Sequence, residues 1–382
     1  MSLRIGIVAA EPSGDQLASR LMAAIQQQNA EVQFEGVGGE NMQALGFRSW
    51  VPMEKLSVMG IVEVLKHLPE LLSIRRQLVR HWRQNPPGLF IGVDAPDFNL
   101  GLEKKLKAYG VPTVHYVCPS IWAWRQGRVK TLQKATDLIL SIFPFEVPLL
   151  AKFRLKALYA GHPLAQEIQG EPDVPQARHD LHLHATAPVL GLLPGSRMSE
   201  VTALAEDFLE TAYRLQQQKP QLEIVAPMAT DKIFDFVDEL RQRQFPHLRI
   251  HLLHGQARQV MAAADVVLTA SGTATLETML YHKPMVVAYK VHWLTHFIAF
   301  GLKLIRTKFI AMPNILAGEE LAPELFQENC NPDNLEREVM VFFDNAEEVE
   351  RITTKFRQLH EELTEGGIEQ VATAVLQLVQ KS

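Results

Sequence analysis

The sequence predicts an α/β protein of two doubly wound, Rossmann-like domains facing a cleft, with additional helices at the C-terminus. Short β-branched apolar runs alternate with amphipathic stretches, which is typical of βα units around a parallel sheet. The alternation stops at residues 170–180, a polar segment with two prolines, and then restarts. A chain of 382 residues is also longer than one hydrophobic core usually grows. The alternative is one larger domain in which 170–180 is a surface loop.

The expected boundaries are 1–170 for an N-terminal domain, 181–345 for a C-terminal domain, and 346–382 for helices that pack back on an N-terminal domain. Expected strands of the first domain are Leu3–Ala9, Val32–Val37, Leu89–Val93, Thr113–Val117, Leu138–Ser141 and Ala157–Tyr159. Its expected helices are Asp15–Asn29, Leu56–Gln84, Leu100–Tyr109 and Val129–Ala135. Expected strands of the second domain are Val189–Leu193, Glu223–Ala226, Arg249–Leu253, Val266–Thr269 and Met285–Ala288.

Composition excludes several classes of protein. Hydrophobic residues make up 47% and charged residues 21%, as in ordinary globular chains. The net charge of -5 gives no basic excess for nucleic acid. The two cysteines, Cys118 and Cys330, cannot form a disulfide framework and suit a reducing cytosol. The apolar run at the N-terminus meets Glu11 at once, and no uncharged run reaches 18 residues, so we expect neither a secretory leader nor a membrane-spanning helix.

In doubly wound sheets, ligands bind at the C-terminal ends of the strands, so the loops there are the candidate sites. The first loop contains Glu11, Ser13 and Gly14. It matches neither dinucleotide-binding nor P-loop motifs, but small residues before a helix present backbone N–H groups to an anion. The alternative is that Ser13 or Asp15 simply caps the helix.

Two carboxylates, Asp94 and Asp97, follow the strand that ends at Val93. Asp94 comes directly at the strand exit and is expected to point into the cleft, where a carboxylate can take a proton from an attacking hydroxyl. Asp97 follows a proline and could instead begin the next helix. Catalysis by one of the pair and capping both remain open at this point.

The loop after the next strand places Trp124 and Arg125 among aromatic and hydroxyl groups, which suits a ligand pocket. Core packing of Trp122 or Trp124 is the alternative. His115 and Cys118 lie three residues apart with no second pair nearby, which is too little for a metal site. We therefore expect no metal and no cofactor.

Two loops of the second domain have phosphate-binding character. Ser196 and Arg197 follow a strand and precede a helix, where backbone N–H groups and a guanidinium can hold a diphosphate. Gly272 and Thr273 repeat this arrangement, and Glu277 lies one turn further on, where its carboxylate can accept both hydroxyls of a ribose. A surface ion pair for Arg197 and a capping role for Thr273 are the alternatives.

Two stretches combine apolar and basic residues. Residues 55–83 hold six Lys or Arg against two Glu, among more apolar side chains than one core-facing stripe needs. This composition is typical of a helix lying on an anionic membrane surface; a well-buried helix or a dimer surface is the alternative. The second stretch, 290–308, contains no acid, whereas 319–382 has fifteen acids against five bases. The residues expected to face the membrane are Val62, Val64, Leu65, Leu68, Arg75, Arg76, Trp293, Phe297, Lys303 and Arg306.

Taken together, these motifs resemble the lipid-A-disaccharide synthases, which have a GT-B-like fold. The segments that carry the resemblance are Glu11–Asp15, Val58–Val64, Asp94–Asn99, His115–Val117 with Pro119–Gln126, Leu193–Arg197, Ala270–Ala274 with Glu277, and Pro313–Asn314. Two mild departures are Ala10 where the family often has Gly and Cys118 where it often has Ser.

The resemblance implies an inverting hexosyltransferase. It would move 2,3-diacylglucosamine from its UDP conjugate to the 6-hydroxyl of 2,3-diacylglucosamine 1-phosphate, forming a β-1,6 disaccharide and UDP. Asp94 would be the base, Arg197 and Asn314 would lie near the diphosphate, and Glu277 would bind the ribose. A homodimer with exchanged C-terminal parts and a cytoplasmic place on the inner face of the inner membrane are also implied.

Two other functions are compatible with the same residues. One is a different UDP-sugar enzyme of this architecture, such as a cell-wall N-acetylglucosaminyltransferase or a UDP-sugar 2-epimerase. The other is a non-catalytic membrane-surface module that binds nucleotide sugars.

Overall fold

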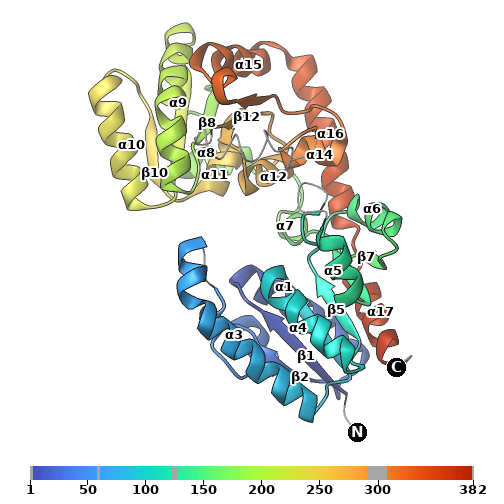
Figure 1. Ribbon diagram of the computed structural model, residues 1–382. Helices are drawn as coiled ribbons and strands as arrows, with labels where there is room; N and C mark the ends of the chain where they lie inside the picture. The colour runs from blue at the N-terminus through green and yellow to red at the C-terminus, as the bar shows by residue number, and fades with distance from the viewer. Residues whose placement is uncertain (1–2, 58–60, 122–126, 291–307, 381–382) are drawn as a thin grey trace. The chain divides into compact units, whose positions relative to one another are not determined.

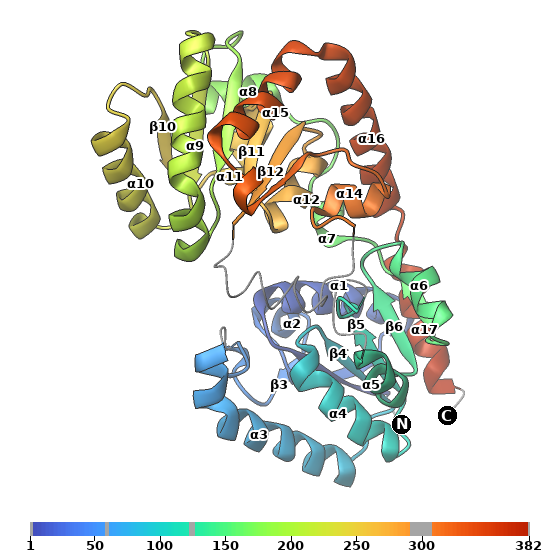
Figure 2. The same ribbon diagram turned by 45° about the horizontal axis from the view of Figure 1, so that its top comes forward.

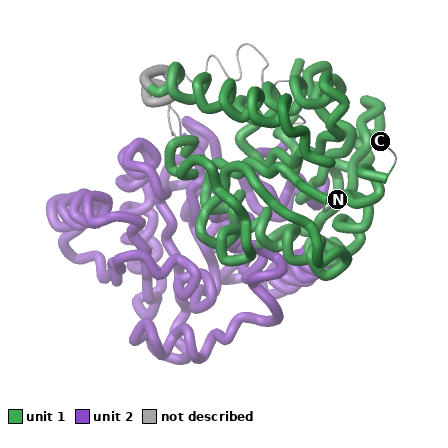
Figure 3. The backbone as a smooth tube through the Cα atoms, turned by 90° about the horizontal axis from the view of Figure 1, so that it is seen from below, with its two compact units in different colours: residues 1–163, 363–382 green, residues 164–362 purple. Residues whose placement is uncertain are grey.

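A computed structural model describes residues 3–57, 61–121, 127–290 and 308–380, with only the backbone described at 61–66. It divides into two compact units (Figure 3). Unit 1 comprises Met1–Pro163 and Leu363–Ser382, and unit 2 comprises Leu164–Glu362. Each unit is a parallel sheet covered by helices on both faces (Figure 1), which confirms the predicted fold class.

The sheet of unit 1 has the order β3-β2-β1-β4-β5-β6-β7, so the strand order reverses between β1 and β4. Ala9 of β1 pairs with Val93 of β4, and Val93 pairs with Tyr116 of β5. The loops that follow these strands therefore leave the sheet side by side. The strands are β1 (Arg4–Ala9), β2 (Gln33–Val37), β3 (Arg48–Ser49), β4 (Leu89–Val93), β5 (Thr113–Tyr116), β6 (Leu138–Ser141) and β7 (Ala157–Tyr159).

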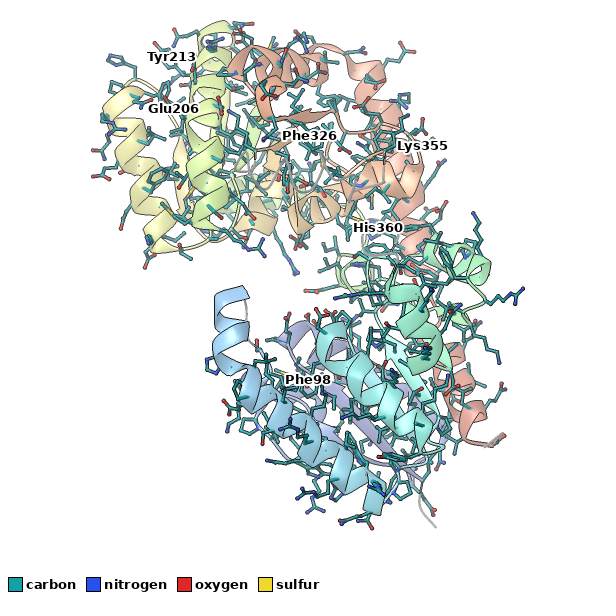
Figure 4. All side chains as sticks on the ribbon, in the orientation of Figure 1. Phe98, Glu206, Tyr213, Phe326, Lys355 and His360 are labelled. Atoms are coloured by element: carbon teal, nitrogen blue, oxygen red, sulfur yellow. The ribbon has the colours of Figure 1, made fainter. Side chains whose placement is uncertain are left out.

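Two helical layers cover this sheet. Helices α1, α2 and α17 lie on one face, and α3, α4 and α5 lie on the other, while α6 packs beside β7. Phe98, labelled in Figure 4, packs on the core of the second face from the first turn of α4. The helices are α1 (Pro12–Gln28), α2 (Glu40–Ala44), α3 (Ile61–Gln84), α4 (Pro96–Ala108), α5 (Arg128–Ala135), α6 (Glu146–Lys152) and α17 (Ile368–Gln380).

Helix α3 is more deeply integrated into the core than its composition suggests. Ile74, Leu78 and Trp82, spaced four apart, are buried on the sheet, and the Trp82 indole N–H donates to Glu35 at 3.2 Å. For these positions the buried-helix alternative is correct. Leu68, two turns earlier, is 41% exposed and remains available for the membrane-facing role.

The C-terminal helix α17 completes the first face of unit 1. Its Val371, Ala372 and Val375 are buried against the core that α1 covers. Burial of each valine is worth about 2 kcal/mol. Gln28 of α1 donates to the Glu369 carbonyl at 2.8 Å, so side-chain and backbone groups fix the docking as well.

The sheet of unit 2 has the order β10-β9-β8-β11-β12-β13, so its strand order reverses between β8 and β11. Thr269 of β11 pairs with Leu193 of β8, which places the two following loops next to each other. The strands are β8 (Val189–Leu193), β9 (Glu223–Met228), β10 (His251–His254), β11 (Val266–Ala270), β12 (Met285–Tyr289) and β13 (Glu324–Phe326). The short edge strands β3 and β13 were not among the expected strands.

Helices α9, α10 and α15 cover one face of this sheet, and α8, α11, α12 and α14 cover the other (Figure 2). The helices of this part of the chain are α7 (Pro163–Glu167), α8 (Val174–Asp180), α9 (Met198–Gln218), α10 (Asp231–Gln244), α11 (Ala257–Ala263), α12 (Thr273–Leu280), α14 (Met312–Ala317), α15 (Pro332–Asp344) and α16 (Ala346–Thr364).

The unit boundaries differ from the expected linker and tail. The segment expected as a linker contains α8, whose buried Arg178 guanidinium binds Asp265 at 2.9 Å and the Ala263 carbonyl at 3.1 Å, so it belongs to unit 2. Most of α16 also belongs to unit 2, because His360 (labelled in Figure 4) hydrogen-bonds His282 at 2.9 Å. Such tertiary contacts have no local sequence signal.

None of the helices within the described residues is both long and apolar enough to cross a membrane.

Burial of His162 predicts an acid-sensitive step in stability. The side chain lies against Phe143, and burial lowers its pKa from 6.5 to about 4. The unfolded chain therefore binds this proton below pH 6.5 while the folded chain does not until about pH 4, so stability falls as pH falls through that window, by about 3 kcal/mol in total. Thermal unfolding of wild type and His162→Phe across the window should show a smaller pH dependence in the variant. Equal pH dependence would contradict this assignment.

Candidate active site

Unit 2 contains a pocket at the point where its strand order reverses, with a cavity volume of about 300 Å³. This is the place where open α/β sheets bind ligands. The loop after β8 contributes Gly195, Ser196 and Arg197, and the loop after β11 contributes Ser271 to Ala274. The structure therefore brings together Ser196, Arg197, Gly272, Thr273 and Glu277 around one cavity, as the two motifs predict.

The loop after β8 holds a carboxylate where an anion would bind. Glu200 accepts hydrogen bonds from the backbone N–H groups of Ser196 and Arg197 at 3.2 and 3.3 Å, and its other oxygen lies 3.0 Å from the Arg197 guanidinium. These are the same groups that the sequence assigns to a diphosphate. The Arg197 side chain is 74% exposed and can turn to a ligand at little cost, since an exposed ion pair contributes about 0–1 kcal/mol. The Arg197–Glu200 contact is the ion pair given as the alternative for Arg197, and it does not exclude ligand binding.

The loop after β11 opens directly onto helix α12. No side chain caps this helix at Gly272, so its first-turn N–H groups are directed toward the pocket. Glu277 lies one turn further, 21% exposed, and its carboxylate is 3.6 Å from Arg258. Burial raises the pKa of Glu277, and the neighbouring Arg258 opposes that rise. A partly desolvated carboxylate at the edge of a phosphate-sized pocket is suited to accept hydroxyl hydrogens.

Asn314 has a different environment from the one the family resemblance implies. It is completely buried, and both hydrogens of its amide are donated, to the Ala322 carbonyl at 2.7 Å and to Glu324 at 2.8 Å. Its oxygen accepts from the N–H groups of Leu321 and Ala322 at 2.7 and 2.9 Å. Because a carboxamide forms four hydrogen bonds, none remains for a diphosphate. Asn314 is also not among the residues that line the pocket.

In unit 1, Asp94 lies at the corresponding reversal of strand order. Its N–H donates to the Tyr116 carbonyl at 2.8 Å, and its side chain is half-buried at the sheet edge. Asp94 and Ala95 have φ of 48° and 41°, and Val117 on the neighbouring loop has φ of 76°. Each such conformation costs about 1–3 kcal/mol in a non-glycine residue. Strained backbone conformations are frequent at functional sites. Here they set the direction of the chain at Asp94, directly after β4.

The carboxylates near Asp94 are used in other ways. Asp97 begins α4, is exposed, and pairs with Arg128. Asp15 is buried, and its carboxylate accepts from the N–H groups of Gly39 and Asn41 at 2.8 and 2.9 Å. Asp15 therefore caps α2 instead of its own helix. Glu11, just before α1, is half-buried, Ser13 is exposed and Gly14 is buried, and all three follow the end of β1 within five residues.

Two of the arginines expected to face the membrane are described by the structure, whereas other predicted positions are not. Arg76 is exposed on α3, whereas the Arg75 guanidinium lies against Gly101 of α4. The predicted positions beyond the description are Val62, Val64, Leu65, Trp124, Arg125, Trp293, Phe297, Lys303 and Arg306.

The sequence motifs did not predict the pocket residues that follow β9 and β10, or the role of Arg258. The loops after β9 and β10 line the cavity with Met228, Ala229 and Gly255. Arg258 links Glu277 to Glu167, which it contacts at 2.6 Å. A glycine between a strand and a helix was a usable signal for Gly255, but Arg258 reaches its partners only through the fold.

Replacing Asn314 separates its structural role from the predicted ligand role. Asn314→Ala removes the Asn314 partner of three backbone groups, the Ala322 carbonyl and the N–H groups of Leu321 and Ala322, so we expect unfolding to become easier by roughly 2–4 kcal/mol. UDP affinity, measured by calorimetry well below the unfolding temperature, should stay near the wild-type value. A large loss of UDP binding with normal stability would restore the diphosphate role.

The chain is similar to known proteins along nearly its whole length. The sequence model of the lipid-A-disaccharide synthetase family matches residues 5–377. The lipid-A-disaccharide synthase of Pseudoalteromonas translucida is 46% identical over 379 residues, covering 99% of this chain and 97% of the relative. That of Serratia proteamaculans is 44% identical over 376 residues, covering 98% of each.

Two solved structures share the fold. One is UDP-GlcNAc 2-epimerase from Neisseria meningitidis bound to UDP-GlcNAc, with a TM-score of 0.59, 11% identity and full coverage of both chains. The other is a UGT transferase from Siraitia grosvenorii in complex with UDP, with a TM-score of 0.59, 12% identity and 99% coverage of both. At such low sequence identity, the structural similarity shows a common GT-B-like architecture and nothing about function. The family match, in contrast, extends along nearly the whole sequence, and the chain belongs to the lipid-A-disaccharide synthases, the glycosyltransferases of lipid A synthesis.

Proposed function

We propose that this enzyme transfers 2,3-diacylglucosamine from UDP-2,3-diacylglucosamine to the 6-hydroxyl of 2,3-diacylglucosamine 1-phosphate. The products are the β-1,6-linked lipid A disaccharide 1-phosphate and UDP. The observation that carries the proposal is the family match over residues 5–377, and the pocket at the strand reversal of unit 2 supports it.

In this proposal unit 2 holds the leaving group. The backbone N–H groups of Ser196, Gly272 and Thr273, together with the Arg197 guanidinium, surround the diphosphate, because helix N-termini and guanidinium groups favour anions. The diphosphate would take over the donors that the Glu200 carboxylate binds, the N–H groups of Ser196 and Arg197 and the Arg197 guanidinium. Glu277 accepts the ribose hydroxyls. These contacts also stabilise the negative charge that develops on UDP as the glycosidic bond breaks.

Unit 1 supplies the base. As the acceptor 6-oxygen attacks the anomeric carbon, Asp94 takes the hydroxyl proton and the bond to UDP breaks, so the configuration inverts in one displacement. Glu11 and Ser13 border the strand ends on this side, and Trp124, Arg125 and Asp97 complete the proposed acceptor side.

Asp94→Ala tests the assignment of the base. We expect the variant to retain its fold and UDP affinity while transfer falls by a factor of at least about 100, since a positioned general base contributes that much. The measurement is UDP release with both acylated substrates, with the disaccharide product identified by mass spectrometry. Asp344→Asn is the matched control, because this exposed carboxylate at the end of α15 binds Lys219 at 2.7 Å and has no proposed role in binding or transfer, so the variant should stay active.

The same assay separates the alternatives. A UDP-sugar 2-epimerase would act without a lipid acceptor, and a nucleotide-sugar-binding module would release no UDP with both substrates present. Near-normal transfer in purified Asp94→Ala would remove Asp94 from the base role.

We also propose that α3 brings the enzyme to the inner face of the inner membrane. Both substrates carry acyl chains, so the enzyme must reach a lipid surface. Leu68 is 41% exposed and Arg76 is exposed on the same helix. Each basic residue near an anionic surface contributes about 1 kcal/mol. Trp293, Phe297, Lys303 and Arg306 belong to the second stretch of apolar and basic residues, for which we propose the same role.

Serine substitutions on α3 test the membrane surface. Val62→Ser, Val64→Ser and Leu68→Ser together should reduce co-sedimentation with vesicles of anionic phospholipid, because the variant loses apolar area for the interface. Val341→Ser is the matched control, since Val341 is equally exposed, at 40%, on α15 of the other unit. Unchanged vesicle binding by the triple variant would assign this face to the protein core or to a dimer.

The proposal includes a homodimer with exchanged C-terminal parts. In this proposal, α17 from the partner chain would pack on the apolar surface beside α1 that α17 covers in this structure. Light scattering of the purified enzyme distinguishes a dimer from a monomer.

A further inference from the structure

A buried polar side chain joins the two strands at the reversal point of unit 1. Asn99 on α4 is completely buried, and its amide nitrogen lies 3.3 Å from the carbonyl oxygen of Val8, 3.1 Å from that of Val93 and 2.9 Å from that of Asp94. It thus bridges the ends of β1 and β4. It also holds the backbone of Asp94, the residue with φ of 48°.

A completely buried acid and imidazole lie next along α4. Glu103, one turn after Asn99, contacts the Nδ1 atom of His115 on β5 through its Oε1 atom at 2.6 Å, and both side chains are fully buried. Burial raises the pKa of Glu103. The missing side chain of Gly92 makes room for this packing. A Cβ atom there would lie 2.2 Å from Glu103 Oε1 and 2.9 Å from Asn99 Cβ, so both side chains pack directly against Gly92 of β4.

Three buried polar atoms of this group have no partner within the described structure: Asn99 Oδ1, Glu103 Oε2 and His115 Nε2. Two of them are oxygens on the same face of one helix, one turn apart. A carboxylate can only accept hydrogen bonds, whereas a carboxylic acid can also donate one. A proton on Glu103 Oε2 would make this oxygen a donor, and the unpartnered acceptor one turn away on the same helix is Asn99 Oδ1.

We propose that Asn99, Glu103 and His115 form a buried hydrogen-bonded chain that positions Asp94, in which Glu103 is a neutral acid. His115 Nδ1–H donates to Glu103 Oε1, Glu103 Oε2–H donates to Asn99 Oδ1, and the Asn99 amide donates to the Asp94 carbonyl. The three are positioning residues, because they act through Asp94. This inference rests on the proposed role of Asp94 as the base. A neutral Glu103 also keeps a second negative charge away from that base.

Glu103→Gln is the test of the neutral acid, since its amide can donate to Asn99 and accept from His115 as a carboxylic acid does. We expect its melting temperature to match that of the wild type and its kcat to stay within about twofold. The infrared spectrum of the full-length enzyme at mildly alkaline pH should contain a protonated-carboxyl band that Glu103→Gln lacks. A clear loss of stability or activity in this variant, or no such band, overturns the neutral acid.

Asn99→Ala tests the positioning role. We expect kcat to fall by about 100-fold, as misplacement of a reacting group by about 1 Å does, while KM for the UDP donor stays unchanged because that pocket is in unit 2. Leu132→Ala is the control: Leu132 is fully buried in the same helical layer, and its loss should lower the melting temperature without this selective loss of kcat. A kcat like that of the control overturns positioning. If Asn99→Ala does not fold, Glu103→Leu, which removes the donor to Asn99, takes its place with the same two outcomes.

The infrared band and the stability of Glu103→Gln are measured without substrate. They therefore hold or fail independently of Asp94→Ala, whose full activity would contradict the proposed base alone.

Discussion

The reversal of strand order in each parallel sheet is the constraint on which the sites depend. Right-handed crossovers place every connecting helix on a face of the sheet and every functional loop at the C-terminal ends of the strands. Where the order reverses, neighbouring loops diverge to opposite faces and leave a crevice between them. In unit 1 that point lies between β1 and β4, beside Asp94. In unit 2 it lies between β8 and β11, where the pocket forms.

The two reversal points are built for different chemistry. The reversal point of unit 2 is lined by small residues and helix N-termini, and its Arg197 guanidinium contacts the Glu200 carboxylate. That of unit 1 is a single carboxylate on a strained backbone, supported from below by buried polar groups. In the proposed reaction, the site of unit 2 stabilises the charge on UDP, and the site of unit 1 holds the base.

Much of the fold follows from sequence patterns, because continuous apolar runs and strand-to-helix loops are local signals. The expected strands Leu89–Val93 and Leu138–Ser141 match β4 and β6 at both ends. Residues whose roles depend on tertiary contacts could not be predicted. Asp15 caps a helix 25 residues away, and α8 lies in a segment whose polar composition resembled a linker. Asn314 illustrates the same limit, since only the structure shows that its four hydrogen bonds are in use. In α3, likewise, only the structure shows which apolar side chains lie in the core, such as Leu78, and which are exposed, such as Leu68.

The central claim is that UDP binds to unit 2 and that the base Asp94 lies in unit 1. Hydrogen exchange of the full-length enzyme with and without UDP tests this claim most directly. We predict that UDP slows exchange in the loops Leu193–Arg197 and Ala270–Glu277 of unit 2 and leaves the loops after β1 and β4 unchanged. Protection centred on the Asp94 loop, with none at Ser196 or Gly272, would contradict it.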